Sequence, residues 1–263
     1  MKFCMSYWSV NKHQPIDQYT IDLHKLSLYM IKRKYGECLL FTDSFSYPYF
    51  KNLGYTDIVL LLDNVPDINT HYNWALGKLF TYKYLSEKNI NFCHVDYDVF
   101  LWEGLSEKFL QNSVFSQCVE TNIYSRYALS TFELFAKNKH YITNISKDES
   151  AYNMGIFGGT NTKFIEKYSN AAIELSLDAH NIDCYRHMLR RTSFSVACLC
   201  EQYYLKICSK IFEQNISVLL NGTTETEIDN SAEENKYTHL SNIKRQPQIK
   251  EKIYNRLVQF NLI

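Results

Sequence analysis

Two carboxylates stand two residues apart, directly after an apolar run in the first half of the chain. Asp96 and Asp98 follow the segment Ile90–Val95, with Tyr97 between them. In a turn at the end of a strand, both carboxylates can converge on one divalent cation, which binds oxygen ligands. Without a cation the two like charges repel and their desolvation is costly. The pair therefore predicts a metal site, and a solvated turn with two unpaired acids is the alternative.

A phosphatase is a second interpretation of the same pattern. Apolar residues followed by Asp-x-Asp also open the haloacid-dehalogenase-like phosphatases, in which the first Asp is the nucleophile. In that family the pair normally lies on the first strand and a small residue follows it. Here three apparent strands come before Asp96, and Phe100 stands where the small residue is expected. The pattern therefore favours the metal site over a phosphohydrolase.

Apolar segments that alternate with helical patterns must position these acids. Segments that resemble strands covered on both faces lie at 3–8, 38–43, 58–63 and 90–98. Helical periodicity covers 19–34 and 74–87. This alternation predicts an α/β fold with a mostly parallel, Rossmann-like central sheet flanked by helices. Because ligands of such sheets bind at the carboxyl ends of the strands, we expect Asp43, Asp63 and the Asp96/Asp98 pair near one crevice.

Composition limits the classes of protein and of partner. The chain has 263 residues, 46% of them hydrophobic, with 8 Gly and 4 Pro, which indicates a globular domain with a sizeable core. Lys plus Arg and Asp plus Glu both number 28, so no overall positive charge favours nucleic acid. The eight cysteines lie in apolar runs and indicate reduced core thiols.

Nothing in the sequence indicates a targeting or spanning segment. The N-terminus, MKFCMSYWSV, is interpreted as a first strand rather than a signal peptide. The longest aliphatic run, 58–62, is too short to span a bilayer. We therefore expect a cytoplasmic protein, with peripheral contact at the inner face of the membrane as a further option.

The second half of the chain has a mixed pattern. A glycine-rich segment covers 152–161, in which Gly158-Gly159 is compatible with a turn, and an apolar helix is expected over 194–212. Residues 223–236 carry five carboxylates and almost no apolar side chain, which predicts a mobile surface loop. The last segment, Pro247–Leu262, places apolar side chains on one helical stripe. Packing of this stripe on the main domain is favoured over membrane docking.

Four ordered motifs resemble those of a known group of enzymes. They are FCHVDYDVFLWEGL preceded by a helix with GKLFTYKYL, then Asn153-Met154-Gly155, then Glu201-Gln202, and last the stretch from His239 to Lys244. Together they are similar to the metal-dependent nucleotide-sugar glycosyltransferases of the GT-A fold, in particular to glycogenin, galactinol synthase and bacterial lipopolysaccharide transferases. Two positions depart from the family pattern: Asn242 replaces a glycine of the last motif, and Glu201 replaces the commoner Asp.

The resemblance implies an organisation and an activity. A GT-A-like domain would cover 1–245, with a nucleotide-binding half at 1–102, an acceptor and sugar half at 103–222 and an acidic loop at 223–236, followed by an amphipathic helix at 246–263. The implied enzyme moves a hexose from a nucleoside-diphosphate sugar, with UDP as the expected nucleotide, to a glycan or lipid-linked acceptor, with retention of configuration. A catalytically silent protein of the same fold that binds sugar or nucleotide is the alternative.

The resemblance also implies roles for particular residues. Asp96, Asp98 and His239 would bind the metal, and an imidazole among oxygen ligands favours Mn²⁺ over Mg²⁺. Glu201 and Gln202 would be catalytic. The donor would contact Lys78, Asp96, Asn153, Gly155 and Lys244. Two of these assignments have independent support, because Lys78 and Glu201 each fall on an apolar helical stripe, where a charged side chain needs a partner or a ligand.

Overall fold

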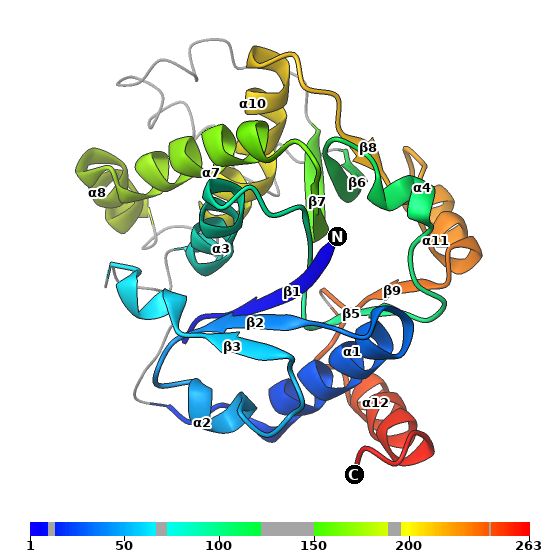
Figure 1. Ribbon diagram of the computed structural model, residues 1–263. Helices are drawn as coiled ribbons and strands as arrows, with labels where there is room; N and C mark the ends of the chain where they lie inside the picture. The colour runs from blue at the N-terminus through cyan, green and yellow to red at the C-terminus, as the bar shows by residue number, and fades with distance from the viewer. Residues whose placement is uncertain (10–13, 67–72, 122–149, 189–195, 242) are drawn as a thin grey trace.

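A computed structural model describes residues 1–9, 14–66, 73–121, 150–188, 196–241 and 243–263 (Figure 1). Its strands are β1 (Lys2–Tyr7), β2 (Leu39–Thr42), β3 (Asp57–Val59), β4 (Phe92–Val95), β5 (Val99–Leu101), β6 (Phe115–Glu120), β7 (Ala151–Gly159), β8 (Ser217–Val218) and β9 (Tyr237–His239). Its helices are α1 (Gln18–Tyr35), α2 (Tyr47–Phe50), α3 (Leu76–Glu87), α4 (Glu107–Leu110), α7 (Thr162–Leu177), α8 (Ala179–Met188), α9 (Val196–Cys198), a π-helix (Leu199–Tyr203), α10 (Tyr204–Ile211), α11 (Glu225–Glu234) and α12 (Pro247–Gln259).

A seven-stranded sheet of order β3-β2-β1-β4-β7-β6-β8 forms the centre of the molecule. The first four strands of this order pair in parallel, β7 pairs antiparallel with both β4 and β6, and β8 is parallel to β6. Strands β5 and β9 form a separate antiparallel pair. The predicted α/β class with a mostly parallel sheet is therefore confirmed, and the carboxyl ends of β1, β2 and β4 meet at one edge.

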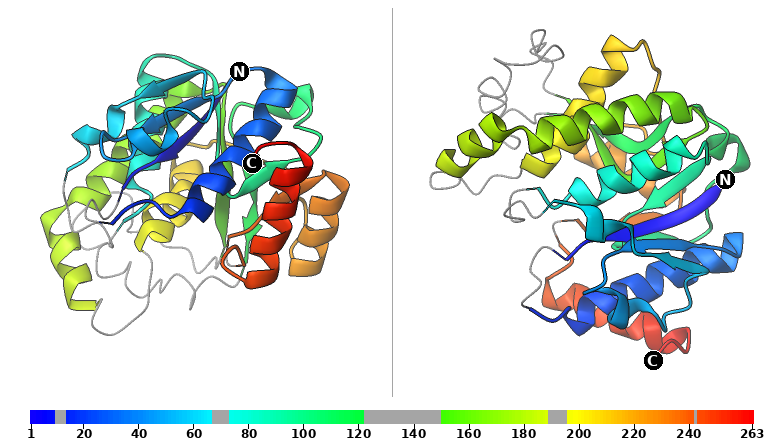
Figure 2. Two further views of the ribbon diagram at one scale, coloured as in Figure 1. Left: turned by 90° about the horizontal axis from the view of Figure 1, so that it is seen from below. Right: turned by 60° about the vertical axis from the view of Figure 1, so that its left-hand side comes forward.

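Helices cover both faces of the sheet, which explains the continuous apolar runs of its strands. Alternate residues of β1 enter different clusters: Cys4 packs with side chains of α3 and α7, whereas Phe3 and Met5 pack with side chains of α1. Figures 1 and 2 show α3, α7 and α10 on one face and α1 on the other. All eight cysteines are free thiols, and six of them are buried.

Helix α12 packs against α1, as its apolar stripe predicts. Ile253 and Leu257 are buried in a cluster with Leu23, Leu26 and Met30 of α1. At the end of α12, the ring of Phe260 stacks on Tyr29 with 5.0 Å between centroids. Within the described part of the chain, no helix combines the length and the apolar character needed to cross a membrane.

Two short segments differ from the prediction. The expected strand 58–63 is divided into β3 and a 3₁₀ turn, Leu61–Asn64, because the Asp63 carboxylate accepts hydrogen bonds from the Ser44 N–H (2.9 Å) and hydroxyl (2.5 Å). Gly158 and Gly159 do not form a turn but are the last residues of β7. A Cβ on Gly158 would collide with the carbonyl oxygen of Phe92, so this strand pair requires a glycine there.

The prediction of an acidic loop at 223–236 is wrong, because most of this segment forms helix α11. Thr224 and Glu227 form a capping box at its N-terminus, in which each side chain binds the backbone N–H of the other residue. Ile228 and Ala232 pack against the core. A good cap and two apolar contacts on one face therefore outweigh the polar composition. The predicted helix 194–212 is observed from Val196 onward, and residues 194–195 lie outside the described part.

Candidate functional site

A tight turn after β4 fixes the two acids of the Asp-x-Asp motif. The Asp96 N–H donates to the Gly155 carbonyl at 2.8 Å, and the Val99 N–H donates to the Asp96 carbonyl at 3.0 Å. The chain then pairs through β5 with β9, in the register that places Val99 opposite His239. The Asp98 carbonyl accepts the Leu240 N–H at 3.0 Å. This pairing brings His239 next to acids that lie more than 100 residues earlier.

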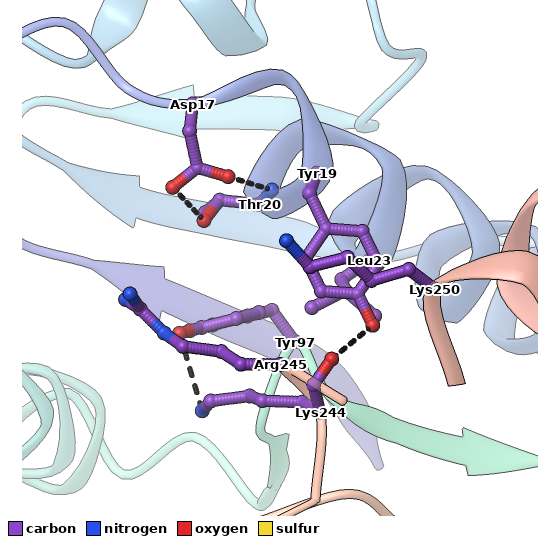
Figure 3. A pocket seen from close by; sticks show the side chains of 8 residues that line it. All are labelled: Asp17, Tyr19, Thr20, Leu23, Tyr97, Lys244, Arg245 and Lys250. Atoms are coloured by element: carbon purple, nitrogen blue, oxygen red, sulfur yellow. Dashed lines mark hydrogen bonds between the residues drawn. The ribbon is translucent and has the colours of Figure 1, made fainter. Parts of the chain in front are cut away.

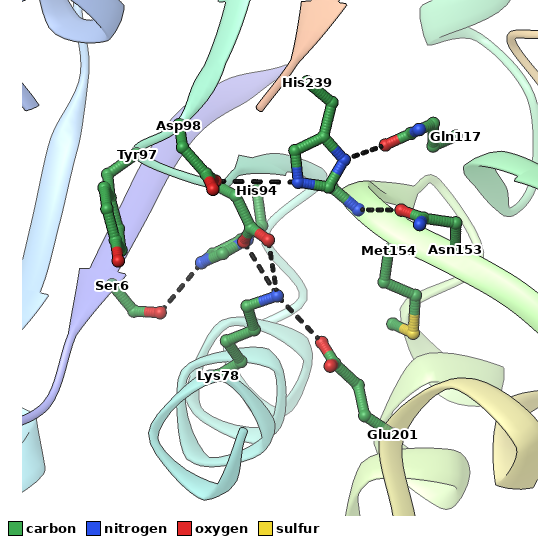
Figure 4. A network of polar contacts seen from close by, with 12 residues as sticks. Ser6, Lys78, His94, Tyr97, Asp98, Gln117, Asn153, Met154, Glu201 and His239 are labelled. Atoms are coloured by element: carbon green, nitrogen blue, oxygen red, sulfur yellow. Dashed lines mark hydrogen bonds and ion pairs between the residues drawn. The ribbon is translucent and has the colours of Figure 1, made fainter. Parts of the chain in front are cut away.

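Asp96, Asp98 and His239 form a group suited to a metal ion. Each offers one ligand atom, and these atoms all lie within 4.8 Å of one another. The Asp98 side chain is 4% exposed and that of Asp96 is 15% exposed. Figure 4 shows His239 and Asp98 facing each other across the end of β4. The three predicted metal ligands therefore converge in the structure.

The imidazole of His239 is oriented by Gln117 of β6. Its Nδ1 lies 2.8 Å from the Gln117 Oε1, which also accepts the Tyr237 hydroxyl at 2.7 Å. Since that amide oxygen only accepts, Nδ1 carries the proton in the neutral ring and Nε2 presents its lone pair. Nε2 lies 3.6 Å from the Asp98 Oδ1. Two lone-pair atoms that face each other at this distance suit a cation between them.

Gly155 of β7 provides the space for this arrangement. A Cβ at this position would lie 2.7 Å from Nδ1 of His239 and would overlap the Gln117 Oε1. The sequence predicted a close approach at Gly155, but by the donor sugar. In the structure the side chains of His239 and Gln117 lie against it.

Replacing Gly155 with alanine is therefore expected to weaken Mn²⁺ binding by about tenfold or more, because the ring of His239 must shift. Isothermal titration with Mn²⁺ measures this. Gly36→Ala is the matched control: Gly36 has φ +79° and no atom within 4 Å of the added Cβ, so alanine strains the backbone without touching the site. Equal Mn²⁺ affinity in Gly155→Ala and wild type would contradict the assigned role of the glycine.

Lys78 of α3 links Asp96 to Glu201. Its Nζ lies 2.8 Å from both Asp96 carboxylate oxygens and 3.1 Å from the Glu201 Oε1 (Figure 4). Burial would lower the pKa of Lys78, but the two carboxylates outweigh burial and raise it, so the ammonium stays charged. The sequence favoured a bound ligand as the group that Lys78 faces. In the structure its ammonium pairs with Asp96 and Glu201, and its contact with the donor stays a prediction.

Glu201 lies in the π-helix and is completely buried. The Tyr82 hydroxyl lies 3.3 Å from its Oε1, and the Tyr168 hydroxyl donates to its carbonyl at 2.7 Å. Burial raises the pKa of the Glu201 carboxyl to about 7, although Lys78 acts in the opposite direction. Its Oε2 has no hydrogen-bond partner among the described residues.

Lys244, in the segment before α12, pairs with the second acid. Its Nζ lies 2.7 Å from the Asp98 Oδ2 and 5.0 Å from the centroid of the Tyr97 ring. Burial would raise the pKa of Asp98, but His239 in its protonated form and the Lys244 ammonium outweigh burial and hold the pKa below its ordinary value. Asp98 is therefore a carboxylate at neutral pH.

The structure places the remaining predicted site residues close by. Asn153 forms hydrogen bonds with other residues of the protein. Its side-chain amide donates to the Glu120 carboxylate at 2.6 Å, and its Oδ1 accepts the Gly155 N–H at 3.0 Å. Gln202 follows Glu201 in the π-helix and is 8% exposed. Their roles in donor binding and catalysis remain predictions.

Asp43 and Asp63 do not belong to the metal-ligand group. Asp43 accepts the N–H groups of Ser9 (2.6 Å) and Ser46 (2.7 Å). Asp63 binds Ser44, as described above. These two acids therefore accept hydrogen bonds from backbone turns. Of the four acids expected at the carboxyl edge of the sheet, only Asp96 and Asp98 belong to the metal-ligand group.

Two residues of the site have no counterpart in the sequence prediction. Gln117 is a buried polar side chain of β6, but that strand, FSQCVE, also contains Ser116 and Glu120, so no contrast in the sequence points to it. His94 is buried in β4, with Nε2 2.9 Å from the Ser6 hydroxyl and Nδ1 3.8 Å from the Asp96 Oδ1. Burial, assisted by Lys78, holds the pKa of His94 well below its ordinary value, so the ring beside Asp96 is neutral.

Comparison with known families gives one match over almost the whole chain. The sequence profile of DUF6734, a family of unknown function, matches residues 1–260. The chain belongs to the DUF6734 family. No curated protein matches it significantly. Membership of DUF6734 therefore places the chain among relatives without assigning an activity.

Solved structures of glycosyltransferases resemble this DUF6734 protein distantly. Mouse xyloside xylosyltransferase 1 is 11% identical, with a TM-score of 0.44 over 83% of this chain and 84% of the other. The bifunctional glycosyltransferase WbbM is 13% identical, with a TM-score of 0.48 over 97% of this chain and 51% of the other. The galactosyltransferase LgtC, solved with donor and acceptor sugar analogues, is 11% identical, with a TM-score of 0.41 over 83% and 73%. The chain thus spans about half the length of WbbM, and similarity at this level assigns no activity to it.

Proposed function

We propose that this protein is a metal-dependent glycosyltransferase that moves a hexose from a nucleoside-diphosphate sugar, with UDP as the nucleotide, to a glycan or lipid-linked acceptor. The observation that supports this most strongly is the convergence of Asp96, Asp98 and His239 at the carboxyl edge of the sheet. Lys78 pairs with Asp96 and Lys244 pairs with Asp98 of this group. Retention of configuration is part of the proposal and rests on the sequence resemblance alone.

The donor atoms fit a divalent cation. Two carboxylates supply negative charge, and the Nε2 lone pair of His239 faces Asp98 because Gln117 holds the proton on Nδ1. Asp96, Asp98 and His239 would hold the ion, and the mixed oxygen and nitrogen set favours Mn²⁺. A divalent cation there would offset the negative charge that grows on the departing diphosphate.

The chain's own groups around this site would bind and orient the substrates. Lys244 reaches Asp98 from the segment before α12, and its ammonium can contact a phosphate oxygen beside the carboxylate. Lys78 fixes the position of Asp96 relative to Glu201. Glu201 offers its Oε2, which has no hydrogen-bond partner in the described part of the chain and would accept a hydrogen bond from a hydroxyl of the donor or the acceptor.

A screen of sugar nucleotides tests the proposal. We expect release of UDP from at least one UDP-sugar in the presence of Mn²⁺, and no release with a chelator. Thermal denaturation gives a second measurement: a ligand present at a hundredfold excess over its dissociation constant stabilises the fold by about 2.7 kcal/mol. UDP with Mn²⁺ should therefore raise the melting temperature more than either alone.

Other outcomes of the same screen separate the alternatives. Stabilisation by GDP with Mn²⁺, and not by UDP, would change the nucleotide but keep the class of enzyme. Stabilisation by nucleotides without turnover of any donor would indicate a binding protein of this fold. Release of free phosphate from small phosphate esters, with no response to any nucleotide, would refute the proposal in favour of a phosphohydrolase.

A further inference from the structure

A pocket of about 380 Å³ lies beside the metal-ligand group, between the start of α1 and the segment that leads into α12. Its lining residues are Asp17, Tyr19, Thr20, Leu23, Tyr97, Lys244, Arg245 and Lys250. Figure 3 shows that they come from α1, from the Asp-x-Asp turn and from the C-terminal segment. The Tyr19 hydroxyl donates to the Lys244 carbonyl at 2.6 Å, which joins the two sides of the pocket.

The pocket carries a positive charge that the described part of the chain does not neutralise. Three of its lining side chains are cations, and Asp17 is its single acid. Both Asp17 oxygens already accept hydrogen bonds from Thr20, at 2.9 and 3.0 Å. Lys244 is paired with Asp98, whereas Arg245 and Lys250 form no ion pair with any described residue. Two exposed cations without an ion-pair partner among the described residues therefore line one open pocket.

Helix α12 adds to this potential. A helix N-terminus carries a partial positive charge, and acidic side chains in the first turn usually offset it. Helix α12 has no acid in its first turn, its N-cap residue makes no side-chain cap, and Lys250 stands near its start. No acid of the first turn offsets the charge of Lys250. A bound anion would remove the repulsion between Lys250, Arg245 and the helix dipole.

The size and the other walls indicate more than a free anion. The rings of Tyr19 and Tyr97 and the side chain of Leu23 supply flat or apolar surface, and Nζ of Lys250 lies 5.2 Å from the centroid of the Tyr19 ring. A volume near 380 Å³ lies in the range of pockets that hold small organic ligands. The pocket thus combines cations that suit an anionic group with aromatic and apolar surface that suits the organic part of a ligand.

We propose that this pocket binds the phosphate group of an organic phosphate through Arg245 and Lys250, next to the metal-ligand group but not through it. The inference goes beyond the proposed function, because these two cations would attract phosphate whether or not the chain transfers a sugar. Two molecules would supply such a phosphate group: the nucleotide itself, or a phosphorylated acceptor that serves as the second substrate.

Titration calorimetry in a chelating buffer tests the pocket without metal. Pyrophosphate and UMP are the probes, and we expect both to bind to the wild type. Arg245→Gln and Lys250→Gln should each weaken binding about 3- to 10-fold, which is typical for loss of one exposed charge contact. Lys252→Gln is the matched control, because Lys252 is an exposed cation of α12 that does not line the pocket. Raising the salt concentration should weaken binding in the wild type.

A second titration distinguishes the two sources. Pyrophosphate is added to protein saturated with UDP and Mn²⁺. Binding that persists and still depends on Arg245 assigns the pocket to a second substrate, and loss of binding assigns it to the nucleotide. The proposal is overturned if neither probe binds without metal, or if Arg245→Gln and Lys250→Gln bind as tightly as Lys252→Gln. Turnover of a sugar nucleotide in that case would leave the proposed function standing.

Discussion

Replacing Asp98 with asparagine is expected to abolish measurable Mn²⁺ binding and to lower the rate of metal-dependent donor cleavage by about 100-fold or more. Asparagine keeps the size of the side chain but removes its charge, so the group loses one of two anionic ligands. Loss of a group that stabilises charge in the transition state typically costs about 10²- to 10³-fold in rate. Calorimetry with Mn²⁺ and initial rates of UDP release measure the two effects separately.

The controls for Asp98→Asn separate the loss of a metal ligand from the effect of changing a buried side chain. Asp98 is 3% exposed and pairs with Lys244, so Asp98→Asn also leaves that lysine without its carboxylate. His239→Gln removes a ligand without disturbing the ion pair, and it should show the same loss of Mn²⁺ affinity. Asp229→Asn, on the exposed face of α11, makes the same chemical change away from the site and should behave as wild type. Full Mn²⁺ affinity in folded Asp98→Asn would refute the metal assignment.

Local patterns predicted the elements that are buried on a regular period. Helices α1, α3 and α12 and strands β1, β2 and β4 follow the predicted segments to within a few residues. The helices bury one face, and the strands are covered on both faces, which gives each kind of element a recognisable apolar pattern. The predictions fail at 58–63 and 223–236. In both places a few hydrogen bonds at one end, to Asp63 and in the Thr224 capping box, decide the structure against the composition.

The site was partly predictable for a different reason. Asp96 and Asp98 were indicated by their position after a buried strand, and Lys78 by its place on an apolar stripe. The contacts that give these residues their properties join distant parts of the chain, such as Gln117 with His239 and Lys244 with Asp98. No local period encodes them, so the sequence identified the charged residues but not how their charges are balanced.

The balance of charge at Lys78 leads to the second large effect. One ammonium lies between two carboxylates, the fully buried Glu201 and the partly exposed Asp96. Burial raises the pKa of both acids, and for Asp96 it outweighs the opposing effect of Lys78. One charge cannot satisfy two desolvated anions, so without a metal one carboxyl group holds a proton near neutral pH. We assign this proton to Glu201, because its side chain is fully buried whereas that of Asp96 is partly exposed.

Glu201→Gln is therefore expected to change how stability depends on pH. The pKa of Glu201 is about 7 in the folded chain, against 4.5 for an ordinary glutamate. Between these values the folded state holds a proton that the unfolded state has released, so stability falls as pH rises through this window. Since each pKa unit corresponds to about 1.4 kcal/mol, the loss contributed by Glu201 by pH 8 is about 3 kcal/mol. Glutamine is neutral at every pH and removes this loss.

The measurement is the difference in free energy of unfolding between Glu201→Gln and wild type, from urea denaturation in chelating buffer at pH 4.5, 6 and 8. The difference should shift in favour of the variant by about 3 kcal/mol across this range. Taking the difference cancels titrating groups that do not interact with Glu201, including buried His24 and His94, whose lowered pKa values make stability rise with pH. Glu234→Gln, an exposed position on α11, should show a flat difference. If the difference in unfolding free energy for Glu201→Gln does not change with pH, Lys78 keeps both carboxylates ionised. In that case neither acid holds a proton in the metal-free site.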